Sequence, residues 1–203
     1  MILTEDRPVS SQTARRAMID SQLRTSGVNE PWVLAAVAAV AREDFVPAAQ
    51  RATCHIDRAI PLGAGRFLAA PLVHGKMLGE AAPSPADTAL LVTSGSGYLA
   101  ALLMPLVGTL DRIDAADAAA TGVASGKNGA YSLIVIDGAV EQVPDALLAG
   151  LAEGGRVVTG LASRSVTRLA VGRKIAGTVA FLPIADLGIP VLPEFAAAKP
   201  WSF

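Results

Sequence analysis

The chain has 203 residues, of which 52% are hydrophobic and 17% charged, and its net charge at neutral pH is −1. This composition excludes an intrinsically disordered protein, because disordered chains combine low hydrophobicity with high net charge. The balanced charge argues against a dedicated nucleic-acid-binding protein, which needs a basic excess or patch to neutralise phosphates. The mean hydropathy of +0.45 raises the question of a membrane protein. However, no apolar run approaches the roughly 20 residues that a spanning helix requires.

The N-terminus and the single cysteine indicate the compartment. The first residues lack the basic start and apolar core of a secretion signal, and Cys54 alone cannot form an internal disulfide. We therefore expect a soluble, cytoplasmic protein with a single domain over residues 1–203, and neither membrane nor nucleic acid as a partner.

The first 82 residues are expected to be mostly helical. Ser10 and Ser11 are typical helix caps, and Pro31 suits a first helical turn. The segment 53–70 is expected to be irregular because it is rich in turn-forming residues. Helices are predicted at residues 11–26, 31–41, 47–52 and 71–82.

From residue 88 onward, short apolar runs of strand length alternate with helical segments. Strands are predicted at 88–93, 109–113, 131–136 and 156–161, antiparallel strands at 168–171 and 178–183, and helices at 98–107, 114–123 and 144–152. Such alternation predicts a parallel sheet covered on both faces. The predicted fold class is therefore α/β, with a helical extension (1–82) before the sheet-forming core (83–203). The Pro-rich tail, 189–203, is expected to lie on the surface through its aromatic residues.

The turn Ser94-Gly95-Ser96-Gly97 is the most informative local feature. Glycine at a strand–helix turn lets the backbone approach a ligand, and the following helix presents unpaired N–H groups. Asp114, at the end of the next strand, can accept hydrogen bonds from ribose hydroxyls. An ordinary tight turn is the alternative, because the full glycine pattern of a phosphate-binding loop is absent.

Other polar residues indicate less. Asp137 follows a strand at the sheet edge where open α/β folds bind ligands, although Asp-Gly is more often a simple turn. His55 and His74 have no metal-ligand spacing with Cys54 or with each other, so we expect packing or surface histidines and no metal site. Cys54 and His55 do not predict a nucleophile pair, because sequence neighbours rarely present both groups to one substrate.

Several segments, in the same order along the chain, resemble the protein-L-isoaspartate O-methyltransferases. They are residues 18–24 (MIDSQLR), 42–47 (REDFVP), 60–65 (IPLGAG), 95–101 (GSGYLAA), 131–136 (YSLIVI) and 151–158 (LAEGGRVV). The resemblance implies a Rossmann-like methyltransferase fold with S-adenosylmethionine as cofactor. It also implies a protein or peptide substrate, methylated on an isoaspartyl carboxylate during protein repair. Since that carboxylate is already ionised at neutral pH, the protein has mainly to align it with the methyl group.

The resemblance also assigns site residues by position. The substrate loop corresponds to Arg66, Phe67, Leu68, Ala69 and Pro71, and the cofactor site to Thr93, Ser94, Gly95, Ser96, Gly97, Asp114 and Asp137. Of these, Asp114 matches the family's ribose-binding acid.

Departures from the family pattern fall on both halves of this site. Ala69 stands where the family has a hydroxyl that positions the carboxylate, so no catalytic residue is assigned, and Phe67 replaces a threonine. Leu91 and Thr93 replace the acid and the first glycine of the cofactor loop, and a β-branched residue narrows the approach to a ligand. Asp137 replaces a small neutral residue, and its charge opposes a carboxylate substrate unless it is paired.

The segment between Asp114 and Tyr131 is too short for the helix, crossover and strand that the family has there. The third strand and much of the adenine pocket are expected to be missing, and a homodimer could cover the bare edge. Together the departures predict isoaspartyl methylation that is weak or lost. The alternatives are an inactive homologue with a binding or scaffolding role and a methyltransferase with a different substrate.

Overall fold

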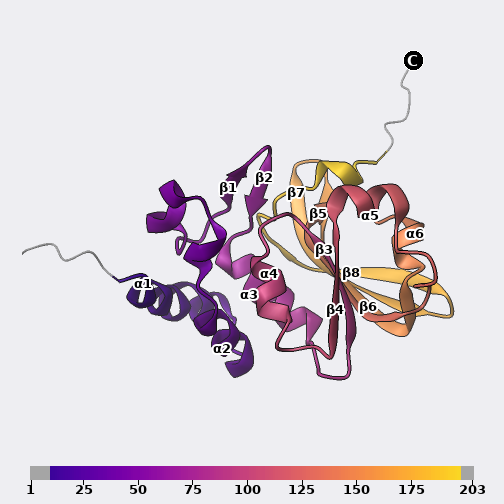
Figure 1. The fold of residues 1–203 in the computed structure, drawn as a ribbon, viewed down its shortest axis with the longest axis horizontal. Coiled ribbons are helices and arrows are strands. Elements are labelled where there is room, and N and C mark those ends of the chain that lie inside the picture. Colours follow the sequence, from indigo (N-terminus) through magenta and orange to yellow (C-terminus); the bar gives the residue numbers. More distant parts are fainter. Residues whose placement is uncertain (1–9, 198–203) are drawn as a thin grey trace, which may run out of the picture.

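The structure, a computed structural model that describes residues 10–197, places a layer of short helices beside a twisted six-stranded sheet (Figure 1). The N-terminal elements are α1 (Ser11–Met18), η1 (Ile19–Leu23), η2 (Arg24–Ser26), α2 (Pro31–Ala39), η3 (Arg42–Phe45), η4 (Ala48–Thr53), β1 (Ile60–Gly63), β2 (Arg66–Leu68) and α3 (Pro71–Ala81). The C-terminal elements are β3 (Thr88–Thr93), α4 (Tyr98–Leu103), β4 (Thr109–Asp114), α5 (Ala115–Thr121), β5 (Tyr131–Val140), α6 (Asp145–Leu148), β6 (Leu151–Ser163), β7 (Val166–Ile175), β8 (Thr178–Asp186) and η5 (Pro193–Phe195).

The predicted first helix is confirmed as one helical stretch, but its geometry changes along its length. It starts as an α-helix capped by the Ser10 side chain, which accepts a hydrogen bond from the Thr13 amide. It then becomes a π-helix and finally a 3-10 helix before Gly27 ends it with a φ of 80°. The second helix begins at Pro31 as expected.

The expectation of an irregular segment at 53–70 was wrong in part, because β1 and β2 form an antiparallel hairpin there. The turn uses Gly63, Ala64 and Gly65, all with positive φ. Strands of four and three residues are too short to show an alternating pattern in the sequence. The hairpin carries the predicted substrate loop.

The sheet has the order β4-β3-β5-β6-β7-β8, and its first four strands are parallel. The last two are antiparallel, as predicted, and longer than predicted. Thr93 pairs with Asp114 in the register of β3 and β4. The glycine-containing turn and the acid of the next strand therefore lie at the same edge of the sheet.

The missing strand is confirmed by the course of the segment that follows β4. Residues 115–130 provide only α5 and a turn before the chain re-enters the sheet as β5. Within residues 10–197, β4 is thus the edge strand on this side of the sheet. A second subunit covering that edge stays a prediction.

The core lies on both faces of the sheet. Alternate residues of β3 point to opposite sides, since Leu91 packs with the cluster under α3 and α4 whereas Leu90 packs with the cluster under α5 and α6. Within the described residues, no helix is both long and apolar enough to cross a membrane.

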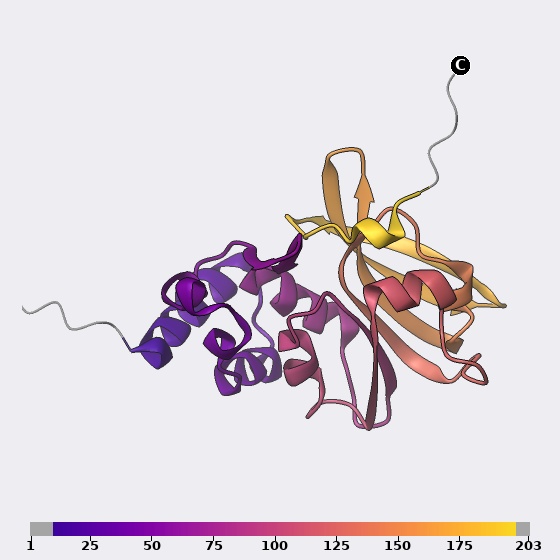
Figure 2. The ribbon, with the colours of Figure 1, turned by 45° about the horizontal axis from the view of Figure 1, so that its top comes forward.

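The C-terminal segment crosses the carboxyl end of β5. The Ala139 amide donates to the Pro190 carbonyl at 2.8 Å, and the Leu192 amide donates to the Ala139 carbonyl at 2.8 Å. Phe195 is buried, as expected for an aromatic anchor, whereas Trp201 and Phe203 lie outside the described residues. In Figure 2 this yellow segment runs above the sheet and meets the β1–β2 hairpin.

Candidate functional site

A groove of about 400 Å³ opens at the carboxyl edge of β3 and β4. It is lined by Thr93, Gly95, Gly97, Ala100, Arg112, Ile113 and Asp114. Gly95 and Gly97 have φ values of 100° and 74°, a conformation that suits glycine, and nothing lies within 4 Å of where a Gly95 side chain would begin. Four of the seven predicted cofactor residues are therefore brought together around one open space.

The remaining residues of the predicted cofactor loop have internal roles. The Ser96 hydroxyl accepts a hydrogen bond from the Tyr98 amide at the start of α4. Ser94 is buried and points away from the groove. Leu91, which replaces the family's acid, is buried in the core.

Asp114 lies half-exposed at the end of β4, where it makes two contacts. Its Oδ1 accepts a hydrogen bond from the Ala116 amide at 2.9 Å and lies 3.6 Å from Arg66 Nη2. The same guanidinium nitrogen lies 2.7 Å from Glu194 Oε1. A residue of the predicted substrate loop thus pairs with the expected ribose-binding acid and with the C-terminal segment.

The predicted substrate loop divides into outward and inward residues. Phe67 is 40% exposed, and Arg66 reaches towards Asp114. Leu68 and Ala69 are buried, as is Pro71 in the first turn of α3. Only two of the five residues are therefore available to a molecule in solution.

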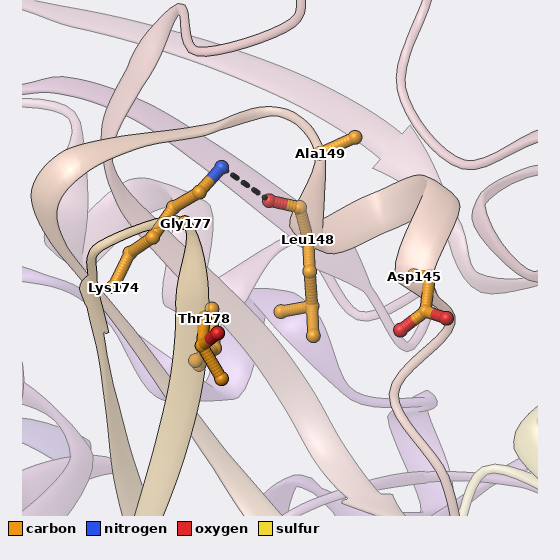
Figure 3. Close-up of a pocket in the computed structure, with 7 residues that line it drawn as sticks. Asp145, Leu148, Ala149, Lys174, Gly177 and Thr178 are labelled. Carbon is orange, nitrogen blue, oxygen red and sulfur yellow. Dashed lines mark hydrogen bonds between the residues drawn. The ribbon is translucent and has the colours of Figure 1, made fainter.

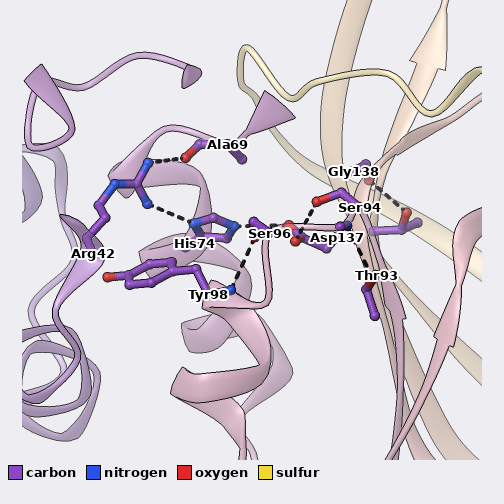
Figure 4. A network of polar contacts seen from close by, with 11 residues as sticks. Arg42, Ala69, His74, Thr93, Ser94, Ser96, Tyr98, Asp137 and Gly138 are labelled. Atoms are coloured by element: carbon purple, nitrogen blue, oxygen red, sulfur yellow. Dashed lines mark hydrogen bonds and ion pairs between the residues drawn. The ribbon is translucent and has the colours of Figure 1, made fainter. Parts of the chain in front are cut away.

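Asp137 corrects the expectation of an Asp-Gly turn. It lies inside β5, and it is 4% exposed. The strand continues past it because the C-terminal segment supplies hydrogen bonds at Ala139. Its carboxylate accepts a hydrogen bond from the Ser94 hydroxyl at 2.8 Å, and its other oxygen lies 3.0 Å from His74 Nε2 (Figure 4).

This contact belongs to a buried polar network that extends into the helical layer. His74 Nδ1 faces Arg42 Nη1 at 3.4 Å, and Arg42 donates to the carbonyls of Cys54 at 2.8 Å and Ala69 at 2.5 Å. Arg42 and His74 are both fully buried. A buried charge is tolerated only when it is paired or well hydrogen-bonded, so the positive Arg42 and the negative Asp137 balance each other across the imidazole.

Aromatic rings enclose the guanidinium. The Arg42 carbon Cζ lies 4.9 Å from the centre of the Tyr98 ring, which also contacts His74 and Phe45. Burial lowers the pKa of the Arg42 guanidinium and raises the pKa of the Tyr98 hydroxyl. These rings cover the network and keep water away from it, which strengthens the electrostatic interactions between its members.

The structure buries both histidines, as expected for packing residues, and gives each of them polar contacts. His74 is a member of the network rather than an isolated packing residue. His55 Nδ1 lies 3.5 Å from Cys54 Sγ, and its Nε2 lies 3.5 Å from Glu43 Oε2. Cys54 is fully buried, however, so this pair is not presented to a substrate.

A further pocket, of about 520 Å³, lies between α6 and the turn that joins β7 to β8 (Figure 3). Lys174 is the cation among its lining residues, and its Nζ donates to the carbonyls of Leu148 and Leu151. None of the predicted site residues lines this pocket. The placement of the predicted residues therefore favours the groove at the carboxyl edge.

Comparisons with known proteins identify the family. The family model described as protein-L-isoaspartate(D-aspartate) O-methyltransferase matches residues 13–120. The protein-L-isoaspartate O-methyltransferase of Koribacter versatilis is 34% identical and aligns with 80% of this chain and 83% of its own length. That of Methanoculleus marisnigri is 30% identical and aligns with 89% and 92%.

Solved structures show the same fold. A Plasmodium falciparum structure, described as this methyltransferase in complex with S-adenosyl-L-homocysteine, superposes with a TM-score of 0.68 at 16% identity. It covers 89% of this chain and 98% of its own. A second structure of such an enzyme gives a TM-score of 0.69 at 16% identity, covering 88% and 65%. By its sequence over most of its length, the chain belongs to the protein-L-isoaspartate O-methyltransferase family.

Proposed function

We propose that this chain retains a weak site for S-adenosylmethionine or S-adenosylhomocysteine, and that its methyl transfer to isoaspartyl carboxylates is weak or lost. Its relatives are named for that reaction, and the Plasmodium falciparum structure is a complex with S-adenosyl-L-homocysteine. The groove at the carboxyl edge of β3 and β4 supports the first half of the proposal. The buried carboxylate of Asp137 supports the second half.

The groove fits an adenosyl ligand in part. Gly95 leaves open space for close approach, whereas a side chain at Gly97 would contact the Phe45 ring. Asp114 Oδ2 has no hydrogen bond within residues 10–197, so it can accept one from a ribose hydroxyl. The part of the groove that would hold the adenine is reduced, because the chain returns from α5 directly to β5 without a further strand. S-adenosylmethionine, when bound, would supply a methyl group already activated on a sulfonium.

The Asp137 carboxylate carries the second half of the proposal. It accepts the hydrogen bond of the Ser94 hydroxyl and lies against His74 Nε2. A hydroxyl and an imidazole are both groups suited to binding a carboxylate. Ala69 offers no hydroxyl, and its carbonyl is bound by Arg42. Donors near the substrate loop thus bind an internal carboxylate, and a second carboxylate beside it would be repelled in this poorly hydrated environment.

The test is calorimetry followed by a transfer assay. We expect S-adenosylhomocysteine to bind weakly, and we expect no measurable ester on an isoaspartyl peptide incubated with S-adenosylmethionine and analysed by mass spectrometry. The Koribacter versatilis enzyme, assayed in parallel, is the positive control. Turnover within about tenfold of that enzyme would contradict the proposal.

One observation favours a methyltransferase with a different substrate. Phe67 is exposed on the β1–β2 hairpin, beside Arg66, and an apolar surface there suits an acceptor other than a carboxylate. Formation of S-adenosylhomocysteine in a screen of uncharged peptides and small molecules would support this candidate. If no acceptor is found and neither cofactor form binds, the remaining role is that of a binding or scaffolding protein.

A further inference from the structure

A second group of reactive side chains lies in the helical layer, away from the groove. Glu43 belongs to η3, and Cys54 and His55 directly follow η4. Cys54 Sγ lies 3.5 Å from His55 Nδ1, and His55 Nε2 lies 3.5 Å from Glu43 Oε2. One ligand atom from each residue lies within 4.8 Å of the other two. Glu43 is distant in sequence from Cys54 and His55, so the spacing of the three residues does not reveal the group.

The three side chains are largely buried, but two of their polar atoms lack hydrogen-bond partners. Cys54 is fully buried, His55 is 6% exposed, and the Glu43 side chain is 18% exposed. His55 Nε2 and Glu43 Oε2 are both buried, and neither has a hydrogen-bond partner within the described part of the chain. Buried polar atoms are normally paired, because losing water without a replacement costs free energy. The nitrogen and the oxygen face each other at 3.5 Å, beyond a normal hydrogen bond, so an ion bound by both would satisfy them.

Neighbouring side chains hold the two residues in place. Arg15 Nη2 donates to Glu43 Oε1 at 2.8 Å, and Gln22 Nε2 donates to the His55 carbonyl at 3.0 Å. Because Arg15 uses Oε1, the other carboxylate oxygen stays free. Such outer contacts are typical of metal sites, where they orient the ligands. Ser11 Oγ, Arg15 Nε and Gln22 Oε1 are also buried without a partner.

We propose that Glu43, Cys54 and His55 bind a divalent transition-metal ion of the Zn²⁺ type. Thiolate, imidazole and carboxylate are the zinc ligands of proteins, with bond lengths of about 2.0–2.3 Å. At a tetrahedral angle, such bonds place two ligand atoms about 3.5 Å apart. The separation of His55 Nε2 from Glu43 Oε2 has this value, whereas Cys54 Sγ lies 3.5 Å from the other ring nitrogen, Nδ1. The three side chains still bring one ligand atom each within 4.8 Å of one another.

The chemistry of binding is a simple exchange. The metal replaces the thiol proton of Cys54, which passes to solvent, and the thiolate and carboxylate together neutralise the divalent charge. One ion uses one nitrogen of the imidazole, so the ligand on the other side of the ring moves towards it. Three protein ligands leave the fourth position to water.

The experiment uses Co²⁺ as a spectroscopic probe on the full chain after treatment with a chelator. We expect a near-ultraviolet thiolate-to-cobalt band that saturates at one ion per chain and disappears when Zn²⁺ is added. The Cys54→Ser variant should lose the band, with binding weakened by about 100-fold, and Glu43→Gln and His55→Asn should weaken binding by about tenfold or more. The matched control is Asp44→Asn, which removes the exposed neighbouring acid and should bind as the wild type does.

A second readout guards against variants that fold poorly. Since a ligand that binds only the folded state stabilises it, Zn²⁺ should raise the melting temperatures of the wild type and of Asp44→Asn equally and that of Glu43→Gln by less. Absence of cobalt or zinc uptake by the wild type would overturn the proposal, as would an unchanged cobalt band in Cys54→Ser or an equal loss in Asp44→Asn. None of these readouts depends on S-adenosylmethionine or on methyl transfer.

Discussion

Arg42 is the residue on which the helical layer and the sheet both depend. Its guanidinium donates to two backbone carbonyls, one after η4 and one in the substrate loop. It also faces His74, which in turn contacts Asp137 on β5. A single fully buried side chain therefore satisfies groups from three parts of the chain.

Replacing this side chain should be costly. We expect Arg42→Met to lower the free energy of unfolding by about 3–5 kcal/mol, because it leaves Asp137 without a balancing charge and two carbonyls without donors. Urea denaturation measures the loss. Arg51→Met, at an exposed position of η4, should change stability by no more than about 0.5 kcal/mol. Equal effects of the two variants would show that the network does not contribute to stability.

Ala69 offers a second test at this scale. Restoring the family's hydroxyl by Ala69→Ser should not restore methyl transfer to an isoaspartyl peptide, because Asp137 still holds Ser94 and Arg66 still pairs with Asp114. The measurement is ester formation by mass spectrometry. A large recovery from this single change would place the whole defect at position 69.

Among the elements, the β1–β2 hairpin has the most consequence for ligand access. Arg66 ties it to the end of β4 through Asp114 and to η5 through Glu194. Arg66 Nη1 and Glu194 Oε2 are nevertheless buried without hydrogen-bond partners within residues 10–197. The hairpin is therefore held against the groove by contacts that do not satisfy all of their polar atoms.

Releasing the hairpin should favour the adenosyl ligand. We expect Arg66→Ala to strengthen S-adenosylhomocysteine binding about two- to fivefold in calorimetry, because Asp114 then loses a competing ion pair of modest strength. Arg168→Ala removes a similar pair with Asp186 on distant strands and should leave the affinity as it is. Weaker binding by Arg66→Ala would mean that the guanidinium itself contacts the ligand.

For the whole molecule, the ion pair of Asp87 and Arg156 connects the two halves. Asp87 accepts hydrogen bonds from Arg156 at 2.8 and 3.0 Å and from the Ser132 hydroxyl at 2.6 Å. Arg156 also donates to the carbonyls of Ala81 and Ala82, where α3 ends. The start of β3, the strands β5 and β6 and the last helix of the N-terminal layer thus meet at one ion pair.

The stability of the protein should depend on pH through this carboxylate. The Arg156 hydrogen bonds hold the pKa of Asp87 well below its usual range. Because the folded-state pKa is lowered, the stabilisation is complete above the unfolded-state value of about 3.9 and is lost as the pH falls below it. We expect Asp87→Asn to cost about 3 kcal/mol at pH 7 in urea denaturation, with a difference from the wild type that shrinks in acid. Asp186→Asn, in an exposed ion pair, is the control, and a pH-independent difference would contradict this role.

The sequence predicts those features of the structure that depend on neighbouring residues better than those that depend on residues distant in the chain. The strand 88–93 was predicted with its observed ends, because buried parallel strands are continuous apolar runs. The missing strand followed from the length of the segment between Asp114 and Tyr131 compared with the family pattern. The Arg42–His74–Asp137 network was not predicted, because its members are distant in sequence and each is unremarkable in its own segment. Only Asp137, a charged residue directly after an apolar run, stands out in the sequence, where it indicates a turn or the cofactor site.

The course of the C-terminal segment has a consequence for synthesis on the ribosome. Residues 189–195 complete the end of β5 and supply Glu194 to a hairpin translated long before them. Until they emerge, the nascent chain leaves the apolar surface under Leu192 and Phe195 uncovered. A transcript truncated before residue 189 would therefore yield a chain that chaperones and proteases recognise as unfinished.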